Sequence, residues 1–210
     1  MKNDELKYTS DIAFTPSVKV IQEKFHSRNG YIRMEESGGW QSEVTPQLEG
    51  FLGMMDSFYL STSNTSGQPY TQHRGGPKGF FKVIDNKTLA FADFSGNRQY
   101  ITAGNLSENN KAFIFLMDYP SKTRIKIWGT AKVVEDDKEL LESLSDTSYK
   151  ARLERAIVFT VKAWDVNCRQ HIQQRFTEED IKKITDSLDK KILKLEALVK
   201  KHKINYENSN

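Results

Sequence analysis

Polar and apolar residues near the start of the chain are arranged in two segments that each open with a Thr-Pro pair, residues 15–28 and 45–56. A threonine can cap a helix, and a proline is tolerated at the first helical position, where its missing N–H would have no partner. The second segment carries apolar side chains at helical spacing: Leu48, Phe51, Leu52 and Met55. The pattern predicts two helices, with a loop or short extended piece at residues 28–40 between them.

Apolar and polar residues alternate with a period of two through much of residues 57–166. Such alternation is typical of strands with one buried face. Residues 79–84 and 88–93 flank the sequence Asp-Asn-Lys and predict a hairpin. Short helices are expected within three ranges: 97–110, 137–144 and 149–156. About six strands interrupted by short helices favour a mainly β (α+β) fold, a small antiparallel barrel with peripheral helices.

One apolar stripe follows residues 177–203, where Thr177 and Asp180 form a capping-box pattern. Its members recur at steps of three or four: Ile181, Ile184, Leu188, Ile192, Leu195 and Leu198. We interpret the stripe as a long helix that packs on the body of the protein or on a partner subunit. The lysine-rich end leaves contact with a membrane surface or nucleic acid as the alternative.

These patterns divide the chain into three expected parts. Residues 1–56 form a helical extension that packs on the barrel, residues 57–176 form the barrel, and residues 177–210 form the amphipathic C-terminal helix and tail.

The composition predicts a soluble cytoplasmic protein. The 210 residues include 31 basic and 28 acidic side chains, so the net charge of +3 is too balanced to indicate nucleic-acid binding. Cys168 is the single cysteine, which excludes an intrachain disulfide and fits a reducing compartment. The first residues lack the apolar core of a signal peptide, and no apolar run is long enough for a membrane span.

Common catalytic signatures are absent from the sequence. It contains neither a GxxxxGK[ST] phosphate loop, nor a GxGxxG fingerprint, nor a GxSxG elbow. The four histidines are scattered without metal-ligand spacing, and one cysteine makes a structural zinc site improbable. These absences disfavour a hydrolase or a metalloenzyme, and no metal is predicted.

Two polar clusters follow neighbouring predicted strands. The sequence QHRGGPKGFFK, residues 72–82, offers basic side chains and glycines that let a backbone approach a flat ligand. The sequence DFSGNRQY, residues 93–100, offers a guanidinium and amides just before a predicted helix, whose first N–H groups favour an anion. Each cluster alone is equally well explained as a solvated turn or surface strand. Together they favour a phosphorylated planar ligand.

The stretches QHRGG, LAFADFSGNRQY, FLMDY, KIWG and WDVNCRQHI resemble those of pyridoxamine 5′-phosphate oxidase-like flavoproteins, in particular a bacterial oxidase-related subgroup. The resemblance extends from about residue 12 to about residue 176. It implies a split β-barrel that forms a homodimer, with FMN held between the two subunits. The expected fold is thus a six-stranded antiparallel split β-barrel with peripheral helices and a long C-terminal helix.

The resemblance also implies roles for individual residues. Arg98 and Gln99 fall at the pair that binds the FMN phosphate, and Lys82 falls at a basic position that often reaches it. Ser95 and Asn97 fall beside the phosphate, and His73, Arg74 and Gly75 fall along the flavin. Arg124 falls where the partner subunit usually contacts the ring, and His171 falls near the C-terminal part that closes the pocket.

Two departures from the oxidase pattern count against pyridoxamine phosphate as the substrate. Gln99 stands where the oxidase has a basic residue, and Arg175 alone represents the oxidase motif that binds the substrate phosphate. The resemblance implies a two-electron oxidoreductase that acts on another small molecule or on NAD(P)H, and it assigns no catalytic residue. A flavin store or redox sensor without turnover is the alternative, as is a relative that binds haem or a deazaflavin.

Overall fold

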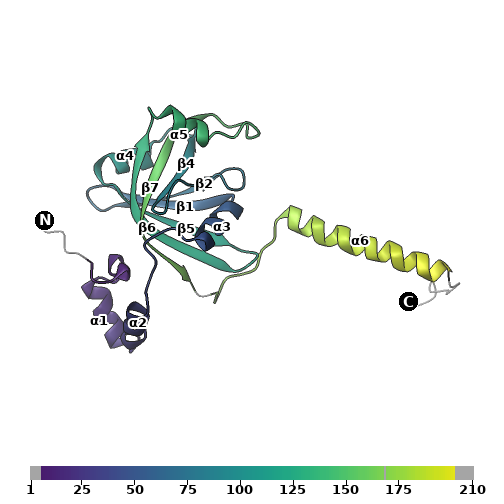
Figure 1. The fold of residues 1–210 in the computed structure, drawn as a ribbon, viewed down its shortest axis with the longest axis horizontal. Coiled ribbons are helices and arrows are strands. Elements are labelled where there is room, and N and C mark those ends of the chain that lie inside the picture. Colours follow the sequence, from purple (N-terminus) through teal and green to yellow (C-terminus); the bar gives the residue numbers. More distant parts are fainter. Residues whose placement is uncertain (1–5, 168, 202–210) are drawn as a thin grey trace. The chain divides into compact units, whose positions relative to one another are not determined.

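A computed structural model describes residues 6–167 and 169–201 of the chain, and its main feature is an antiparallel sheet (Figure 1). The seven strands lie in the order β2-β1-β5-β6-β7-β4-β3, and every neighbouring pair is antiparallel. Their bounds are β1 (Ser57–Ser63), β2 (Pro69–Gly75), β3 (Lys82–Val83), β4 (Thr88–Phe94), β5 (Lys111–Asp118), β6 (Thr123–Val134) and β7 (Leu153–Asn167). Among the described residues, no ladder joins the edge strands β2 and β3, so the sheet is not closed.

The mainly β class is confirmed, but the expected number of six strands is wrong. The hairpin predicted at residues 79–93 is present, with Lys82 opposite Ala90 and Val83 opposite Leu89. This short β3 is a seventh strand. It is only two residues long because the preceding Phe80 and Phe81 are buried in the core instead of extending the ladder.

The helices have these bounds: η1 (Thr9–Ile12, a 3-10 helix), α1 (Pro16–Lys24), α2 (Arg28–Glu36), α3 (Pro46–Met54), α4 (Ile101–Glu108), α5 (Lys138–Ser143) and α6 (Glu178–Lys201). The two predicted threonine caps are confirmed. Thr15 accepts from the Val18 N–H at 3.4 Å, and Thr45 accepts from the Leu48 N–H at 3.3 Å. Each proline stands at the first helical position, as its fixed φ allows.

Two local predictions are wrong. Residues 28–40 contain helix α2 because a charge pair two turns apart is buried on it, with Arg28 Nη2 2.6 Å from Glu35 Oε2. The helix expected at residues 149–156 is absent, since β7 begins at Leu153 and pairs there with β4. In both places a tertiary contact decides the local structure.

The core lies on one face of the sheet, against which α3 packs. Its largest fully buried side chains are Phe58, Phe81, Phe91, Phe159, Leu48, Leu52, Leu60, Leu89, Ile114, Leu116, Ile127 and Ile157. Gly129 marks a bulge between β6 and β7, where a Cβ would lie 2.1 Å from the Thr160 carbonyl oxygen. A bulge increases strand bending, and this one helps to curl the sheet around the core.

The chain divides into two compact units. The second unit combines Tyr119–Lys122 with the residues from Gln170 onward, including α6. Within it, Gln174 Nε2 donates to the Pro120 carbonyl at 2.7 Å. The predicted capping box is confirmed, because the Asp180 N–H donates to Thr177 Oγ1 and the Thr177 N–H donates to Asp180 Oδ2, each at 3.1 Å.

The three-part division predicted from the sequence stays a prediction, and Cys168 lies outside the described residues. None of the helices in the described part of the chain is both long and apolar enough to cross a membrane.

Candidate functional site

A groove runs between β2 and β4, two strands that are not neighbours in the sheet. An ion pair between Arg74 Nη1 on β2 and Asp93 Oδ1 on β4 connects them across it. Two adjoining hollows of about 210 and 160 Å³ lie along it, and a third of about 230 Å³ continues beyond the end of β2. The first and second share Gln72, Arg74 and Phe94 in their walls, and the second and third share Phe80 and Phe94. The three hollows therefore follow one another along the groove.

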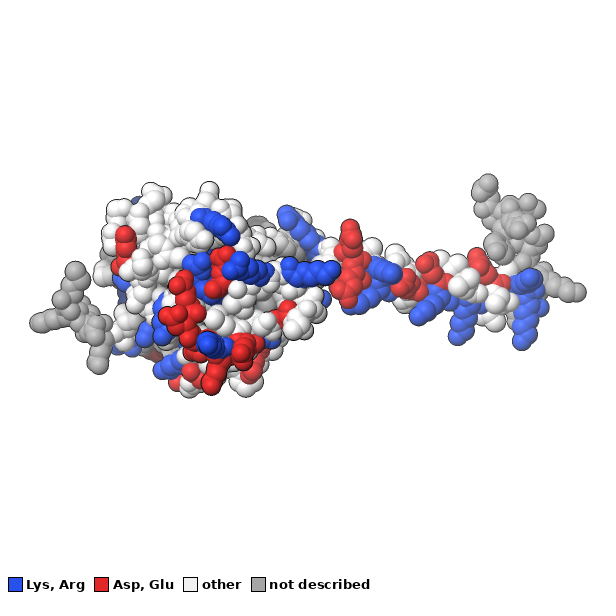
Figure 2. All heavy atoms as spheres, turned by 90° about the horizontal axis from the view of Figure 1, so that it is seen from above, with Lys and Arg blue, Asp and Glu red and all other residues white. Residues whose placement is uncertain are grey.

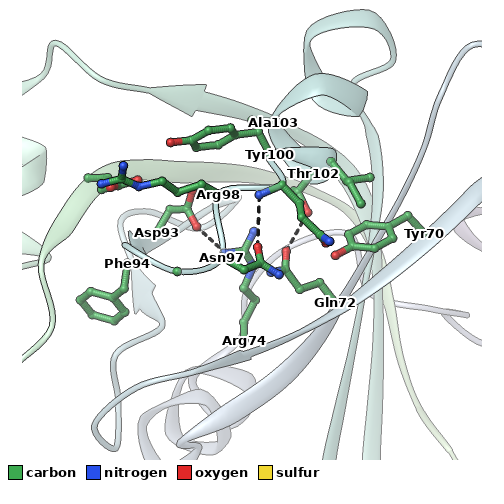
Figure 3. A pocket seen from close by; sticks show the side chains of 14 residues that line it. Tyr70, Gln72, Arg74, Asp93, Phe94, Asn97, Arg98, Tyr100, Thr102 and Ala103 are labelled. Atoms are coloured by element: carbon green, nitrogen blue, oxygen red, sulfur yellow. Dashed lines mark hydrogen bonds and ion pairs between the residues drawn. The ribbon is translucent and has the colours of Figure 1, made fainter.

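Strand alternation decides which β2 side chains face the first hollow. Tyr70, Gln72 and Arg74 are spaced by two residues and all line it (Figure 3). Across the hollow, Thr102 Oγ1 donates to Gln72 Oε1 at 3.0 Å. This hydrogen bond fixes the start of α4 against β2.

The loop between β4 and α4 forms the opposite wall of the first hollow. Arg98 and Tyr100 both have left-handed backbone conformations, with φ of 59° and 53°. Non-glycine residues rarely adopt this region, and such strain concentrates at binding sites. Asn97 Oδ1 accepts from the Gln99 N–H at 3.2 Å and stabilises the turn. The loop thus holds an unfavourable backbone shape.

The N-terminus of α4 opens into the same hollow. Tyr100 is its N-cap and provides no side-chain cap, and the first intrahelical bond runs from the Gly104 N–H to the Tyr100 carbonyl at 2.8 Å. The N–H groups of the first turn therefore have no intrahelical partner. Ile101, Thr102 and Ala103 belong to this turn and line the hollow. Together with the helix dipole, these N–H groups favour a bound anion.

Two carboxylates near the hollow are already neutralised by arginines. Asp93 pairs with Arg74 and lies 3.5 Å from Arg155 Nε, while Arg155 Nη2 contacts Glu154 Oε2 at 3.1 Å. The Arg155 guanidinium also lies over the Tyr100 ring, 5.0 Å from its centroid. Arg155 thus links the two carboxylates to the strained loop.

The protonation of this network follows from the same contacts. Burial alone would raise the pKa of Glu154, but hydrogen bonds from Arg155 and Ser95 and the charges of Arg155 and Arg98 hold that pKa below its ordinary value. Burial alone would lower the pKa of Arg155, but Glu154, Asp93 and Glu135 raise it above its ordinary value. Both groups are therefore charged at neutral pH.

Arg98 differs from these arginines. Its side chain is exposed, extends away from that of Arg74 (Figure 3), and makes no hydrogen bond within the described part of the chain. Its charge is one of those that hold the pKa of Glu154 below its ordinary value. The long side chain is thus available to a ligand at the rim of the hollow.

The donors of the first hollow fit a phosphate group. Among the described residues, the Arg98 side chain has no hydrogen-bond acceptor and the buried Arg74 Nε has no hydrogen-bond partner. The first turn of α4 has no side-chain cap. A phosphate monoester offers three acceptor oxygens and a negative charge to such a set. The hollow is smaller than the 300 Å³ or more typical of a complete small-molecule site, so it suits the phosphate end of a larger ligand.

The predicted site residues are distributed along the groove. Arg74, Asn97, Arg98 and Gln99 line the first hollow, and Ser95 lies beside it through its hydrogen bond to Glu154. His73 and Gly75 line the second hollow, where the His73 ring packs edge-on against Tyr59 at 5.6 Å. Lys82 lines the third hollow, near Asp146, whose pKa is lowered mainly by hydrogen bonds from Ser148 and also by the charge of Lys82.

Two predicted residues lie elsewhere. Arg124, at the start of β6, lines none of the three hollows, and its buried Nε has no hydrogen-bond partner in the described structure. His171 belongs to the second unit. Their roles at the cofactor stay predictions.

Four residues at or next to the first hollow were not predicted from the sequence. Tyr70 and Gln72 could have been found, because they precede Arg74 at steps of two on the same strand. Arg155 and Glu154 carried no such signal. They lie about 60 residues further along the chain and reach the hollow only because β7 pairs with β4.

The chain is similar in part to several solved structures. No curated protein matches the chain. Among solved structures, HupZ of Group A Streptococcus has a TM-score of 0.46 and 14% identity, over 63% of this chain and 99% of that one. An oxidase-like protein of Lactobacillus delbrueckii, described as a putative pyridoxamine 5′-phosphate oxidase, has a TM-score of 0.45 and 21% identity, over 60% and 95%. An FMN-binding protein of Syntrophomonas wolfei has a TM-score of 0.45 and 14% identity, over 70% and 97%.

A family model gives the decisive match. The model described as pyridoxamine 5′-phosphate oxidase matches residues 44–175, more than half of the chain. The matched range includes all seven strands and every residue that lines the three hollows. The chain therefore belongs to the pyridoxamine 5′-phosphate oxidase family.

Proposed function

We propose that this protein binds FMN in the groove between β2 and β4 and acts as a two-electron oxidoreductase on a small molecule. The observation that carries the proposal is the donor set of the first hollow, Arg98 with the uncapped first turn of α4. A charged guanidinium beside a helix N-terminus is suited to a phosphate monoester, which FMN carries at the end of its ribityl chain. Membership of the family makes a flavin the expected ligand.

Different residues would contact different parts of the cofactor. Arg98 and the α4 amides would hold the phosphate, while Gln72 and Thr102 would offer polar contacts to the ribityl chain. The second hollow, with Phe80, Phe94 and Ala92 in its wall, would present an apolar surface to the flat ring. Bound FMN would supply the electron chemistry by accepting two electrons from a substrate.

The protein's own part in the reaction is to position the ring and fix the charges around it. The Arg74–Asp93 pair locks the Arg74 guanidinium at the junction of the first and second hollows. A fixed positive group near a flavin stabilises negative charge on the reduced ring. Because Asp93, which also lies 3.5 Å from Arg155 Nε, holds Arg74 in place before any ligand binds, no reorganisation of Arg74 is needed at the moment of reaction.

We further propose a homodimer in which the partner covers the open side of the groove. None of the three hollows exceeds about 230 Å³, so each is too small to enclose FMN alone. A second subunit would supply the missing wall, and Arg124 and His171 remain candidates for contacts there. The single cysteine fits a reducing compartment, and a cytoplasmic location is part of the proposal.

Titration of the cofactor-free protein with FMN, FAD and riboflavin tests the binding proposal. We expect FMN to bind, and riboflavin, which lacks the phosphate, to bind at least about tenfold more weakly. Equal affinity for FMN and riboflavin, or binding of neither, would contradict the phosphate site. Haem, titrated in parallel, should leave no Soret band in the protein fraction after gel filtration.

Anaerobic mixing of the FMN-loaded protein with NADH, NADPH and reduced small molecules tests the oxidoreductase proposal. Bleaching of the flavin absorbance, followed by recovery with an electron acceptor, is the expected result. FMN binding without bleaching by any donor would support a flavin store or redox sensor instead.

A further inference from the structure

Helix α6 exposes an apolar stripe that neither the sheet nor the groove explains. Its members are half exposed: Ile181 (47%), Ile184 (50%), Leu188 (50%), Ile192 (51%), Leu195 (60%) and Leu198 (44%), and Val199 extends the stripe at the same spacing. A 24-residue helix is about 36 Å long, so the stripe is a long and narrow surface. Apolar side chains in such an arrangement indicate packing against another helix.

The stripe repeats every eleven residues. Ile181 is followed by Ile192, Ile184 by Leu195 and Leu188 by Val199. An eleven-residue repeat corresponds to 3.67 residues per turn, close to that of a straight helix, so the stripe does not wind around the helix. It is also almost symmetric about residue 190, because Ile181 and Val199 lie equally far from that point, as do Leu188 and Ile192. A second copy running in the opposite direction would therefore place apolar side chains against apolar side chains along the whole stripe.

The charges of α6 are divided between its two halves. Residues 178–189 carry five acidic side chains and two lysines, a net charge of −3, whereas residues 190–201 carry five lysines and one glutamate, a net charge of +4. Figure 2 shows the largest group of red side chains at the start of the helix and blue side chains at its end. The order suits the helix dipole, with acids in the first turn and lysines in the last.

We propose that two copies of this chain associate through an antiparallel pairing of their α6 helices. Antiparallel pairing places each acidic half beside a basic half, whereas parallel pairing would place like charges side by side. Beside the stripe, Glu178 comes near Lys200 of the second copy and Lys182 near Glu196 of the second copy. Opposed helix dipoles add to the same preference.

The charge division also favours a second copy of α6, rather than a membrane surface, as the partner of the stripe. Helices that lie on anionic membranes carry lysine and arginine along their whole polar face. The acidic half of α6 would be repelled by such a surface. The proposal does not depend on flavin binding, since no groove residue takes part in it.

Cross-linking tests the pairing and its direction. Two single-thiol proteins are made in a Cys168→Ser background, one with Lys182→Cys and one with Glu196→Cys, and each is treated with a short bis-maleimide alone and after mixing. Antiparallel pairing predicts a cross-linked two-chain band mainly in the mixture. A band in each protein alone, without enrichment in the mixture, would show parallel pairing and overturn the proposal. No band in any sample would place α6 against its own chain or another partner, and would overturn it as well.

A matched pair of substitutions shows whether the stripe carries the association. Leu188→Lys lies in the stripe, whereas Leu193→Lys lies on the opposite side of the helix and is more exposed, at 65%. We expect Leu188→Lys to abolish the cross-link and to weaken α6-dependent association by at least about tenfold in sedimentation velocity, since a buried leucine contributes that much to binding. Leu193→Lys should change neither, and circular dichroism confirms that both variants keep the helix. Equal effects of the two substitutions would contradict the pairing face.

Discussion

Two arginine–carboxylate clusters in this protein look alike in chemistry but differ in completeness. In the N-terminal helices, Arg28 donates to both oxygens of Glu35 and to Gln22, and Ser10 donates to Glu35 as well. In the groove, Asp93 lies between Arg74 and Arg155, and both of these arginines keep a buried Nε without a hydrogen-bond partner in the described part of the chain.

We interpret the difference as one between a structural cluster and the cluster of the proposed binding site. A buried polar group left without a partner is costly, so a cluster that serves stability alone is expected to be satisfied. The Arg28 cluster meets that expectation. The groove cluster retains donors next to an uncapped helix and a strained loop, which is the arrangement expected where a ligand supplies the missing acceptors. Four predictions test this contrast, beginning with the largest effect.

Glu35→Gln should destabilise the protein and leave FMN affinity unchanged. The substitution removes the negative charge that compensates Arg28, at a site where the Glu35 side chain is fully buried. Breaking such a pair lowers the free energy of unfolding by about 3 kcal/mol. Urea denaturation measures the loss. Glu36→Gln, an exposed neighbour on the same helix, is the control and should change stability by less than about 0.5 kcal/mol. Similar stability of the two variants would show that the Arg28 cluster is not structural.

Arg98→Ala should have the opposite profile. It removes a charge-assisted contact to phosphate and should weaken FMN binding by about ten- to hundredfold, equivalent to about 1.5–3 kcal/mol. Stability of the cofactor-free chain should be unaffected, because the side chain is exposed and makes no hydrogen bond within the described residues. Flavin fluorescence quenching measures the affinity. Arg33→Ala, another exposed arginine remote from the groove, should leave it unchanged.

Asp93→Asn should increase the preference for FMN over riboflavin by a few fold. The substitution removes a negative charge from the wall of the first hollow and leaves Arg74 and Arg155 with less compensation, so the hollow becomes more attractive to an anion. The ratio of the two affinities, measured at low ionic strength, reports the change. A fall in that ratio would mean that Asp93 positions Arg74 for the phosphate more than it opposes the phosphate charge.

The smallest effect concerns pH. The pKa of Glu154 is held below its ordinary value of 4.5, so its carboxylate stabilises the folded state above that pH. This contribution is lost as the pH falls from 4.5 through the lower folded-state pKa. Thermal unfolding followed between neutral pH and pH 3 should show a shallower acid loss for Glu154→Gln than for the unsubstituted protein. Parallel curves for the two proteins would show that the Glu154 carboxylate does not stabilise the folded state through this network.

The features that could be predicted from sequence are either local contacts or residues in short motifs that resemble those of the family. The caps at Thr15, Thr45 and Thr177 involve contacts within three residues, and the pattern alone predicts them. The loop carrying Asn97 and Arg98 was recognisable from its donors and from its resemblance to known flavoproteins. The structure places both residues in the wall of the first hollow.

The features that were missed depend on contacts between distant segments. Helix α2 requires the burial of Glu35 against Ser10, which lies 25 residues earlier. The carboxylates at the hollow are unexpected near the proposed phosphate site, and their neutralisation by Arg74 and Arg155 becomes visible only when β2, β4 and β7 are brought together. Strand alternation and motif spacing contain no information about such pairings.

The central claim is that the hollow between β2 and α4 holds the phosphate of FMN through Arg98. A thermodynamic cycle tests it most directly, with FMN and riboflavin each titrated into the unsubstituted protein and into Arg98→Ala. If Arg98 binds the phosphate, the variant should lose about tenfold or more in FMN affinity and almost nothing in riboflavin affinity. Equal losses for the two ligands, or no loss for either, would contradict the claim.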